Sequence, residues 1–536
     1  MNMVRVWGGG QYLASSFYDE ADKLGMLVWQ EVSFACAIYP AHAEFAASVK
    51  AEIVYQTTRL SAHPSLVLWC GNNEAEQNKM NAEFWQQYKA LAYDVIIKTL
   101  RSQMKLGNAD TALWPSSPSN GFQSSWSDPH STSRGDVHVY VYFGDCTDSS
   151  QYQSPAPRFQ SEFGFPSYPQ EAELVPRSHS TSDLATYSAF NIARQDLNCP
   201  LSNFTISGYS GRKTGCQFPM MKTLLPLPRG GWANQSATTW RHSLYAGQIA
   251  QALCVGAQAE WLRRGRDTAS QTSGSLFWQL NSEWPGASKS SLEYDGGWKA
   301  LHHFAERFYA PFSATAWVTN AYQNVSFALA NDGREALTAS WRLEVWRYNE
   351  TKPMKTSEMP SVTLAAGSGK VVLDAVFHSS LTHDVHVSSS AALFLRAVAT
   401  ASDGSVSSTF TPLGKNGLAG AQGFLVASAS VTLTVHANLS VTLLADAVVP
   451  HAFLRLRPPV KNAAQMKDGA QPQAEGRFSR NALLLLPNEP VMLDFLPLSG
   501  NPASTLSVAE MRARLTVDCF NRVGGCEAKS EEVSAY

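Results

Sequence analysis

The sequence predicts a multidomain protein, with a (β/α)8 TIM-barrel domain that lacks its first strand followed by two β-sandwich domains of immunoglobulin-like type. Its 536 residues are enough for two to four domains. Over residues 1–312, short apolar runs alternate with helical patterns. From residue 313, helical periodicity nearly disappears and strand-length segments follow one another. A mixed α/β part therefore precedes an all-β part.

Seven strands are expected in the first part of the chain. They are placed at Val4–Trp7, Met26–Trp29, Ser65–Trp69, Ala112–Pro115, Val137–Tyr142, Arg158–Glu162 and Ser275–Trp278. Helices are expected at Glu44–Leu60, Asn81–Met104 and Thr238–Arg263. Strands that alternate with helices indicate a parallel sheet. Seven of them in about 310 residues suit a TIM barrel without one strand, and a doubly wound sheet is the alternative.

Two sandwiches are predicted after the barrel, at residues 313–422 and 423–536. Val325–Leu329, Trp341–Trp346 and Ala391–Val398 have strand length, and Gly, Ser and Asn turns separate them. The polar stretch Pro458–Gly476 is expected to be a long loop.

Composition excludes several classes of protein. The formal net charge of -2 argues against nucleic acid or an anionic membrane as the main partner. No run of about 18 apolar residues occurs, so no membrane span is predicted. Eight cysteines include no CxxC pair and no zinc spacing, and His302 and His303 are adjacent, so no metal or cofactor is predicted. Cys519 and Cys526 form either a local disulfide or two unpaired thiols.

Two glutamates follow apolar strands at positions suited to catalysis. Glu74 ends the segment Trp69–Glu74, and Glu162 ends an apolar strand before Gly164. The carboxyl ends of parallel strands face the active-site mouth of a barrel. Glycoside hydrolysis needs two such carboxyl groups, one protonated and one ionised. A solvated loop glutamate and a salt-bridged glutamate at a strand end are the alternatives.

Seven motifs occur in one order along the first 312 residues. They are Val4–Gly10, Leu24–Glu31, His63–Ser65 with Gly71–Glu74, Ser116–Gly121, Gly135–His138, Ser161–Gly164 and Phe277–Asn281. Together they resemble the β-mannosidases of glycoside hydrolase family 2, and Gly476–Ser479 resembles a turn in the last sandwich of that family. The doubled Asn before Glu74 and the Arg-x-Trp-Gly-Gly-Gly run favour mannosidases over the galactosidase and glucuronidase relatives.

The resemblance implies a role for each catalytic carboxyl group. Glu74 matches the family's acid/base and Glu162 its nucleophile, which implies a retaining two-step reaction. The expected substrates are terminal β-D-mannose residues of mannosides and N-glycan fragments. Non-catalytic carbohydrate binding and another family 2 exo-glycosidase are the alternatives. Lysosomal or extracellular residence follows from the family and, weakly, from five N-x-S/T sequons, at Asn203, Asn234, Asn324, Asn349 and Asn438.

Further residues are expected to contact the sugar or the catalytic glutamates. Asn73 is expected to donate to the sugar 2-OH, and Arg5 to keep the nucleophile ionised. The remaining candidates are Trp7 and Trp278 as walls of the mannose subsite, His138 as a substrate contact, and Tyr140, or in its place Tyr142, as a hydrogen-bond donor to Glu162.

Some positions depart from the family. The first barrel strand and the family's N-terminal domains have no counterpart, which favours a fragment or incomplete gene model over a degenerate relative. N-terminal residues Met1–Trp7 also lack a signal-peptide pattern. Glu31 replaces an Asp, Ser282-Glu283 follow Asn281 where an Asp is usual, and Lys289 replaces a Trp. The last change is expected to weaken sugar stacking.

Overall fold

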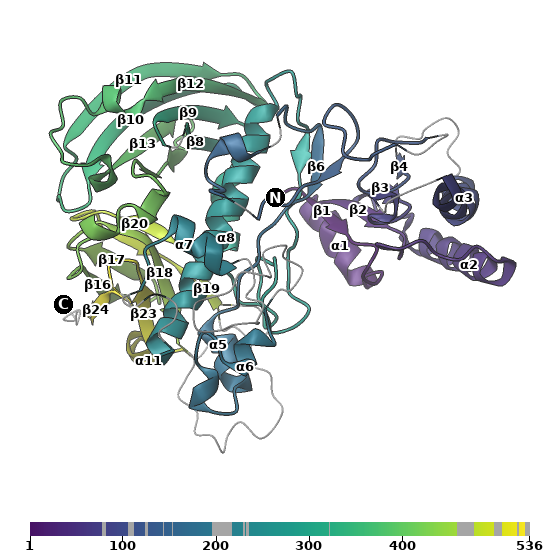
Figure 1. The fold of residues 1–536 in the computed structure, drawn as a ribbon, viewed down its shortest axis with the longest axis horizontal. Helices are drawn as coiled ribbons and strands as arrows, with labels where there is room; N and C mark the ends of the chain where they lie inside the picture. Colours follow the sequence, from purple (N-terminus) through teal and green to yellow (C-terminus); the bar gives the residue numbers. More distant parts are fainter. Residues whose placement is uncertain are drawn as a thin grey trace. The chain divides into compact units, whose positions relative to one another are not determined.

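The protein is described by a computed structural model (Figure 1). Its described residues are 1–77, 82–104, 112–123, 127–142, 144–152, 154–195, 217–228, 231, 235–320, 322–457, 476–497, 506–522 and 525–530. The sequons Asn203 and Asn234 and nearly all of the expected loop Pro458–Gly476 lie outside them. The chain forms two compact units. The first comprises Met1–Tyr140, Gln153–Phe163 and Trp261–Phe277, and the second Val141–Tyr152, Gly164–Glu260 and Trp278–Tyr536.

Seven parallel strands of the first unit lie at the predicted positions, in two sheets. The first sheet has the order β1 (Met3–Val6), β2 (Leu27–Glu31), β3 (Leu66–Cys70) and β4 (Leu113–Trp114). The second has the order β5 (Val137–His138), β6 (Phe159–Glu162) and β7 (Gly274–Ser275). Strand order follows chain order in both sheets. A doubly wound sheet reverses its order at a switch point, so the alternative prediction is not supported.

Helices cover one face of the four-stranded sheet. They are α1 (Ser15–Leu24), α2 (Ala43–Leu60), α3 (Ala82–Leu91), η2 (Ala92–Ile97) and α4 (Lys98–Met104). Their apolar side chains, Tyr18, Ile53 and Ile96 among them, share one core with Val28 and Leu113 of the sheet. The predicted helix Asn81–Met104 is thus three segments, because a π-helical turn separates α3 from α4. Figure 1 shows α1 and α2 beside the purple strands.

The described helices of the second unit before the sandwiches are short, except for α8 (Ala237–Gly265), which has 29 residues. These helices are η4 (Ser149–Gln151), α5 (Glu171–Leu174), η5 (Val175–Arg177), η6 (Thr181–Asp183), α6 (Ala189–Ile192), α7 (Gln217–Leu224), α8 and α9 (Ala300–Phe308). The predicted helix Thr238–Arg263 corresponds to α8, whose last turn belongs to the first unit. A disulfide joins Cys146 to Cys254 of α8. His302 and His303 are buried on α9.

A first two-sheet sandwich follows α9. One sheet is β12 (Ser368–Phe377), β9 (Asn324–Asn331) and β8 (Phe312–Thr319). The other is β11 (Lys355–Leu364), β10 (Leu337–Arg347), β13 (Leu393–Ala401) and β14 (Val406–Ser408), with β15 (Thr411–Pro412) beside β13. α10 (His378–Leu381) follows β12. Phe327 of one sheet and Trp341 of the other belong to the same buried core, as alternating inward side chains require.

A second sandwich contains the C-terminal strands. Its sheets are β21 (Val491–Leu493), β17 (Val441–Ala445), β16 (Ser430–Val435) and β24 (Glu527–Ser530); β20 (Leu483–Leu485), β18 (Val449–Leu456) and β23 (Leu515–Asp518); and β19 (Gly476–Phe478) with β22 (Phe495–Pro497). They share one core, and α11 (Val508–Arg514) contributes Met511 to it. Cys519 and Cys526 are joined by a disulfide, which decides between the two predictions for them.

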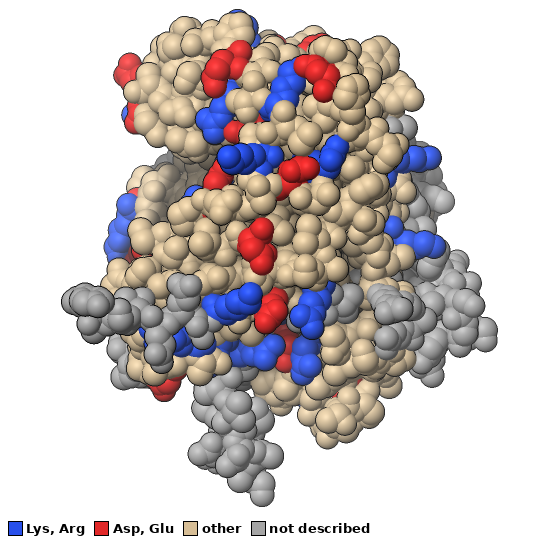
Figure 2. Space-filling view, turned by 90° about the vertical axis from the view of Figure 1, so that its left-hand side faces the viewer, with Lys and Arg blue, Asp and Glu red and all other residues tan. Residues whose placement is uncertain are grey.

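The charges on the visible face are dispersed. Figure 2 shows Lys and Arg among Asp and Glu on a mostly uncharged surface, in line with the near-neutral composition. Among the described helices, none is long and apolar enough to cross a membrane.

Candidate active site

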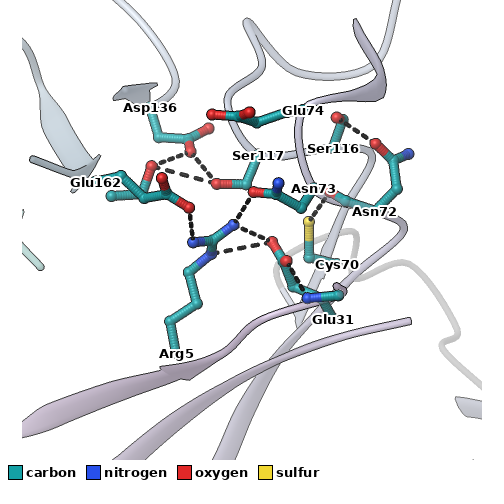
Figure 3. Close-up of polar contacts among 12 residues, drawn as sticks. Arg5, Glu31, Cys70, Asn72, Asn73, Glu74, Ser116, Ser117, Asp136 and Glu162 are labelled. Atoms are coloured by element: carbon teal, nitrogen blue, oxygen red, sulfur yellow. Dashed lines mark hydrogen bonds and ion pairs between the residues drawn. The ribbon is translucent and has the colours of Figure 1, made fainter. Parts of the chain in front are cut away.

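The candidate site is assembled from the carboxyl ends of the parallel strands of the first unit. Arg5 lies on β1, Glu31 ends β2, and Asn73 and Glu74 follow β3, while Glu162 ends β6. Figure 3 shows their side chains converging on one region. Short apolar strands fix each polar side chain at a strand end, and parallel pairing brings those ends to one edge.

Arg5 connects three of these residues. Its Nη1 donates to Glu162 Oε1 at 2.6 Å, and its Nη2 donates to Asn73 Oδ1 at 2.6 Å and to Glu31 Oε1 at 2.8 Å. Burial disfavours the charged guanidinium, but Glu31 and Glu162 outweigh it and raise the pKa of Arg5 above its ordinary value. Arg5 therefore places its positive charge against the Glu162 carboxyl group, and its expected role in keeping the nucleophile ionised stays a prediction.

Glu31 holds Arg5 from the opposite side. Burial raises the pKa of Glu31, and Arg5 and the Gly8 N–H, which donates to Glu31 Oε2 at 2.7 Å, partly offset that rise. Gly8 has to be glycine, because a Cβ there would lie 2.6 Å from the oxygen of Phe34 and 2.7 Å from that of Val32. This close approach explains the first glycine of the Gly8–Gly10 run. Glu31, which stands where the family usually has Asp, still contacts Arg5.

Glu162 accepts hydrogen bonds on both carboxylate oxygens. Besides Arg5, Tyr140 Oη donates to Glu162 Oε2 at 2.6 Å. The side chain of Glu162 is only 6% exposed. Of the two tyrosines considered from the sequence, Tyr140 is the one that makes this contact in the first unit. Tyr142 belongs to the second unit, where its ring lies near Lys289 and Phe165.

Glu74 is the more accessible of the two carboxyl groups. Its side chain is 27% exposed, and its backbone has a φ of 57°, in the left-handed region. Strained backbone of this kind is concentrated at functional sites. Burial raises the pKa of Glu74, but the hydrogen bond and charge of His138, together with the hydrogen bonds of Gln77 and Cys36, outweigh burial, so the net direction is downward. The thiol of Cys36 lies 3.5 Å from Glu74 Oε2.

His138 lies between the two glutamates. One oxygen of Glu74, one of Glu162 and a ring nitrogen of His138 are all within 4.8 Å of one another. His138 Nδ1 is 2.7 Å from Glu74 Oε1 and 3.5 Å from Glu162 Oε2. Such a set has metal-ligand chemistry, but the Arg5 guanidinium already neutralises Glu162 at contact distance. The other ring nitrogen, Nε2, lies 3.1 Å from Ser117 Oγ, so both ring nitrogens contact protein groups, and the expected contact of His138 with the sugar stays a prediction.

Asp136 is linked to His138 through the hydroxyl of Ser117. Ser117 Oγ and Ser161 Oγ donate to Asp136 Oδ2 at 2.7 and 2.5 Å (Figure 3). Trp114 Nε1 donates to Asp136 Oδ1 at 2.8 Å. No role was predicted for Asp136, Ser117 or Ser161, although each lies inside one of the seven motifs. Cys36 was also missed, and no pattern in the sequence marks it.

The adjacent residues Asn72 and Asn73 have different roles. Asn72 supports the loop, since Ser116 Oγ donates to Asn72 Oδ1 at 2.7 Å and Asn72 Nδ2 donates to Tyr88 Oη at 3.2 Å. Asn73 enters the site, where its Oδ1 is held by Arg5 and its Nδ2 is directed to Cys36 Sγ at 3.5 Å. Fixing Oδ1 on a cation orients the amide so that its NH2 group is presented for donation.

The two tryptophans lie in different units. Trp7 follows β1 and is half-buried, and a Cβ on Gly9 would fall 2.1 Å from its ring, so the ring folds over its own glycine loop. Trp278 is half-buried in the second unit, and its part in a sugar subsite stays a prediction. The departures near it have local partners: Ser282 Oγ lies 2.6 Å from Ser288 Oγ, and Gln279 Nε2 donates to Glu283 at 2.6 Å.

Comparisons with known proteins agree with the motifs. No family model matches the chain. A β-mannosidase of Capra hircus is 36% identical over 326 residues, which are 58% of this chain and 35% of that protein. A β-mannosidase of Mus musculus is 33% identical over 392 residues, 69% of this chain and 42% of that protein. The chain thus matches well under half the length of these relatives.

Solved structures show the same fold. A β-D-mannosidase from Dictyoglomus thermophilum has a TM-score of 0.74 and 20% identity, covering 99% of this chain and 57% of that one. The exo-chitosanase CsxA from Amycolatopsis orientalis has a TM-score of 0.63 and 16% identity, covering 97% of this chain and 59% of that one. The chain is a relative of the β-mannosidases.

Proposed function

We propose that this chain is the catalytic part of a retaining exo-β-mannosidase. The observation that carries the proposal is the placement of Glu74 and Glu162, whose oxygens lie within 4.8 Å of each other and of His138. Retaining glycosidases hold their two carboxyl groups about 5–5.5 Å apart, whereas inverting enzymes leave room for a water between them. The proposed substrates are terminal β-D-mannose residues of mannosides and N-glycan-derived oligosaccharides.

The proposed fold is a TIM barrel followed by two immunoglobulin-like sandwiches, at residues 1–312, 313–422 and 423–536. Arg5 on β1 reaches Glu162 on β6, and the Trp29 and Phe159 rings lie 5.9 Å apart, so the two sheets of the first unit face a common interior. Converging strand ends of this kind are the arrangement of a barrel mouth.

In the first step, Glu162 attacks C1 of mannose and the bond from C1 to the leaving oxygen breaks. Arg5 and Tyr140 hold the Glu162 carboxyl group in place, because each donates a hydrogen bond to one of its two oxygens. Glu74 gives its proton to the leaving oxygen. The bound sugar covers the exposed part of Glu74, and this desolvation raises the pKa of Glu74 against the effect of His138.

In the second step, Glu74 acts as the base. It takes a proton from water while the water oxygen attacks C1, and the ester bond to Glu162 breaks. The anomeric carbon is inverted twice, so its configuration is retained. Asn73 Nδ2 donates a hydrogen bond to the 2-OH of the sugar, and this contact strengthens in the transition state.

The proposed location is the lysosome or the extracellular space. The disulfides Cys146–Cys254 and Cys519–Cys526 support it, because disulfides persist in oxidising compartments. Of the three described sequons, Asn349 and Asn438 are exposed and Asn324 is half-buried on β9.

Aryl β-mannoside hydrolysis by the chain, followed by proton NMR of the first sugar released, tests the proposal. The expected product is β-mannose, and Glu162→Gln should abolish turnover. Glu74→Gln should lower the rate about 10²–10⁴-fold, the usual contribution of a general acid/base. Release of α-mannose would contradict the retaining mechanism. Faster hydrolysis of aryl β-galactoside or β-glucosaminide would contradict the substrate, and no hydrolysis of any of the three would favour carbohydrate binding.

A further inference from the structure

The second unit contains a buried group of three carboxyl side chains, which the proposed reaction does not use. Glu173 lies on α5, and Glu293 and Asp295 lie between β7 and α9. One oxygen from each lies within 4.8 Å of the other two. Glu173 is 0% exposed and Glu293 is 4% exposed. We refer to these three residues as the carboxylate triad.

Protein groups satisfy only part of the triad. Glu293 Oε1 accepts from the Gln170 N–H at 2.7 Å and from Gln248 Nε2 at 3.1 Å. Glu173 Oε2 accepts from the Asp295 N–H at 3.3 Å. Glu173 Oε1 is buried and has no hydrogen-bond partner. A buried carboxylate oxygen is seldom left without a partner, so this oxygen indicates a ligand within the triad.

The nearby cations only partly compensate the triad. The Lys299 ammonium donates to the main-chain oxygens of Ser167 and Ser288 at 3.1 and 3.3 Å, and Arg177 donates to the main-chain oxygen of Glu173. The charges of Lys299 and Arg455 lower the pKa of Glu293 and that of Arg177 lowers the pKa of Asp295, but burial outweighs them and raises both.

A tight turn presents two members of the triad. The N–H of Glu293 donates to the oxygen of Gly297 at 2.8 Å, and the N–H of Gly296 donates back to Glu293 at 3.1 Å. A Cβ at Gly297 would lie 2.8 Å from Glu293 Oε2, so glycine leaves that oxygen its position. Glu293 and Asp295 also line a cavity of about 120 Å³, which has room for water ligands and whose other lining residues include Arg455, Arg477 and Arg514.

We propose that the carboxylate triad binds one divalent cation, with Ca²⁺ preferred. The three side chains offer only oxygen ligands, which hard cations select. Ca²⁺ accepts irregular coordination completed by water, and the cavity beside Glu293 and Asp295 supplies that water. The cation would join α5 to the segment before α9, two parts of the chain about 120 residues apart, as the 122-residue separation of Asp295 and Glu173 shows.

Protons are the competing occupants of the triad. Burial, with the charges of Glu293 and Asp295, raises the pKa of Glu173 to about 9, and burial raises that of Glu293 to about 7. Protonation would relieve the same repulsion without a metal. The two occupants differ in their response to added cation, so binding can be measured directly.

Thermal unfolding of the full chain, dialysed first against a chelator, tests the proposal. At pH 7.5, Ca²⁺ at about 100 times its Kd should raise the Tm by several degrees. Glu173→Gln and Glu293→Gln should abolish this response. Without Ca²⁺ they should unfold at or above the wild-type Tm, because they remove repulsion. Glu358→Gln, an exposed change on β11, is the control and should keep the full response.

Two results would overturn the cation site. One is a wild-type Tm that neither Ca²⁺ nor Mg²⁺ raises at pH 7.5, which leaves protons as the occupants. The other is a Ca²⁺ response that persists in both Gln variants, which puts the cation elsewhere. Because the readout is stability, either result is independent of whether the chain hydrolyses mannosides.

Discussion

At the scale of single residues, the site depends on charges brought together inside the first unit. Arg5 and Glu162 are 157 positions apart in the chain, yet their side chains are in contact. Their partners Glu31 and Asn73 are buried, so little solvent screens this group. Loss of one member should therefore affect both stability and chemistry.

Replacing Arg5 should separate these two effects. Arg5→Met leaves buried carboxylates unpaired and should destabilise the chain by about 3–5 kcal/mol. Adding Glu31→Gln removes one orphaned charge and should recover part of that stability, but no activity. Urea unfolding measures the stability of each variant, and turnover of an aryl β-mannoside measures its activity. Recovery of activity in the double variant would contradict the role given to Arg5.

His138 should set the pH range of activity. Its hydrogen bond and charge lower the pKa of Glu74, so His138→Gln leaves burial dominant and the pKa of Glu74 rises. Because Glu74 must be protonated in the first step, the basic limb of kcat/KM against pH should move to higher pH. Ser116→Ala, which affects Asn72 instead, serves as the control. If the basic limb of kcat/KM stayed in place or moved to lower pH, the effect assigned to His138 on Glu74 would be contradicted.

At the scale of elements, the strands were predictable and the contacts between them were not. Short apolar runs placed six of the seven parallel strands, because each strand is local in sequence, and the first strand, at Arg5–Trp7, was placed by the resemblance to the family. The break in the helix predicted over Asn81–Met104 was missed, since residues Ala92–Ile97 have ordinary helical composition and the π turn depends on packing. The link from Asp136 through Ser117 to His138 was also missed, because it depends on how the strands pair.

The glycine run after β1 supports a prediction at this scale. Gly8→Ala forces a Cβ against two carbonyl oxygens and should cost about 1–3 kcal/mol, with a loss of activity through Glu31. Gly10→Ala is a matched control, because its nearest neighbour would be 3.4 Å away. Urea unfolding compares the two. Equal stability of both variants would contradict the close packing at Gly8.

At the scale of the whole molecule, pairing of distant cysteines lay beyond the sequence. Nothing in the spacing of Cys146 and Cys254 marked them as partners, because a disulfide requires only that folding bring the two together. Closure of the seven strands into a barrel likewise rests on resemblance and on contacts between the two sheets.

The two disulfides should differ in their contribution to stability. Cys146–Cys254 closes a loop of 108 residues and Cys519–Cys526 one of 7. By loop-closure entropy, their removal should cost about 5 and about 2 kcal/mol. Unfolding of the paired Cys→Ser variants tests the order, and a larger loss from the short loop would contradict it.

The central claim is that Glu162 forms a covalent bond to the sugar. Incubation with a 2-fluoro-β-mannosyl fluoride, which slows release of the sugar, should attach one 2-fluoromannosyl group. Peptide mass spectrometry should then find that group on Glu162, and Glu162→Gln should remain unlabelled. Labelling of another carboxylate, or hydrolysis of aryl β-mannoside by the chain without any covalent adduct, would contradict the account.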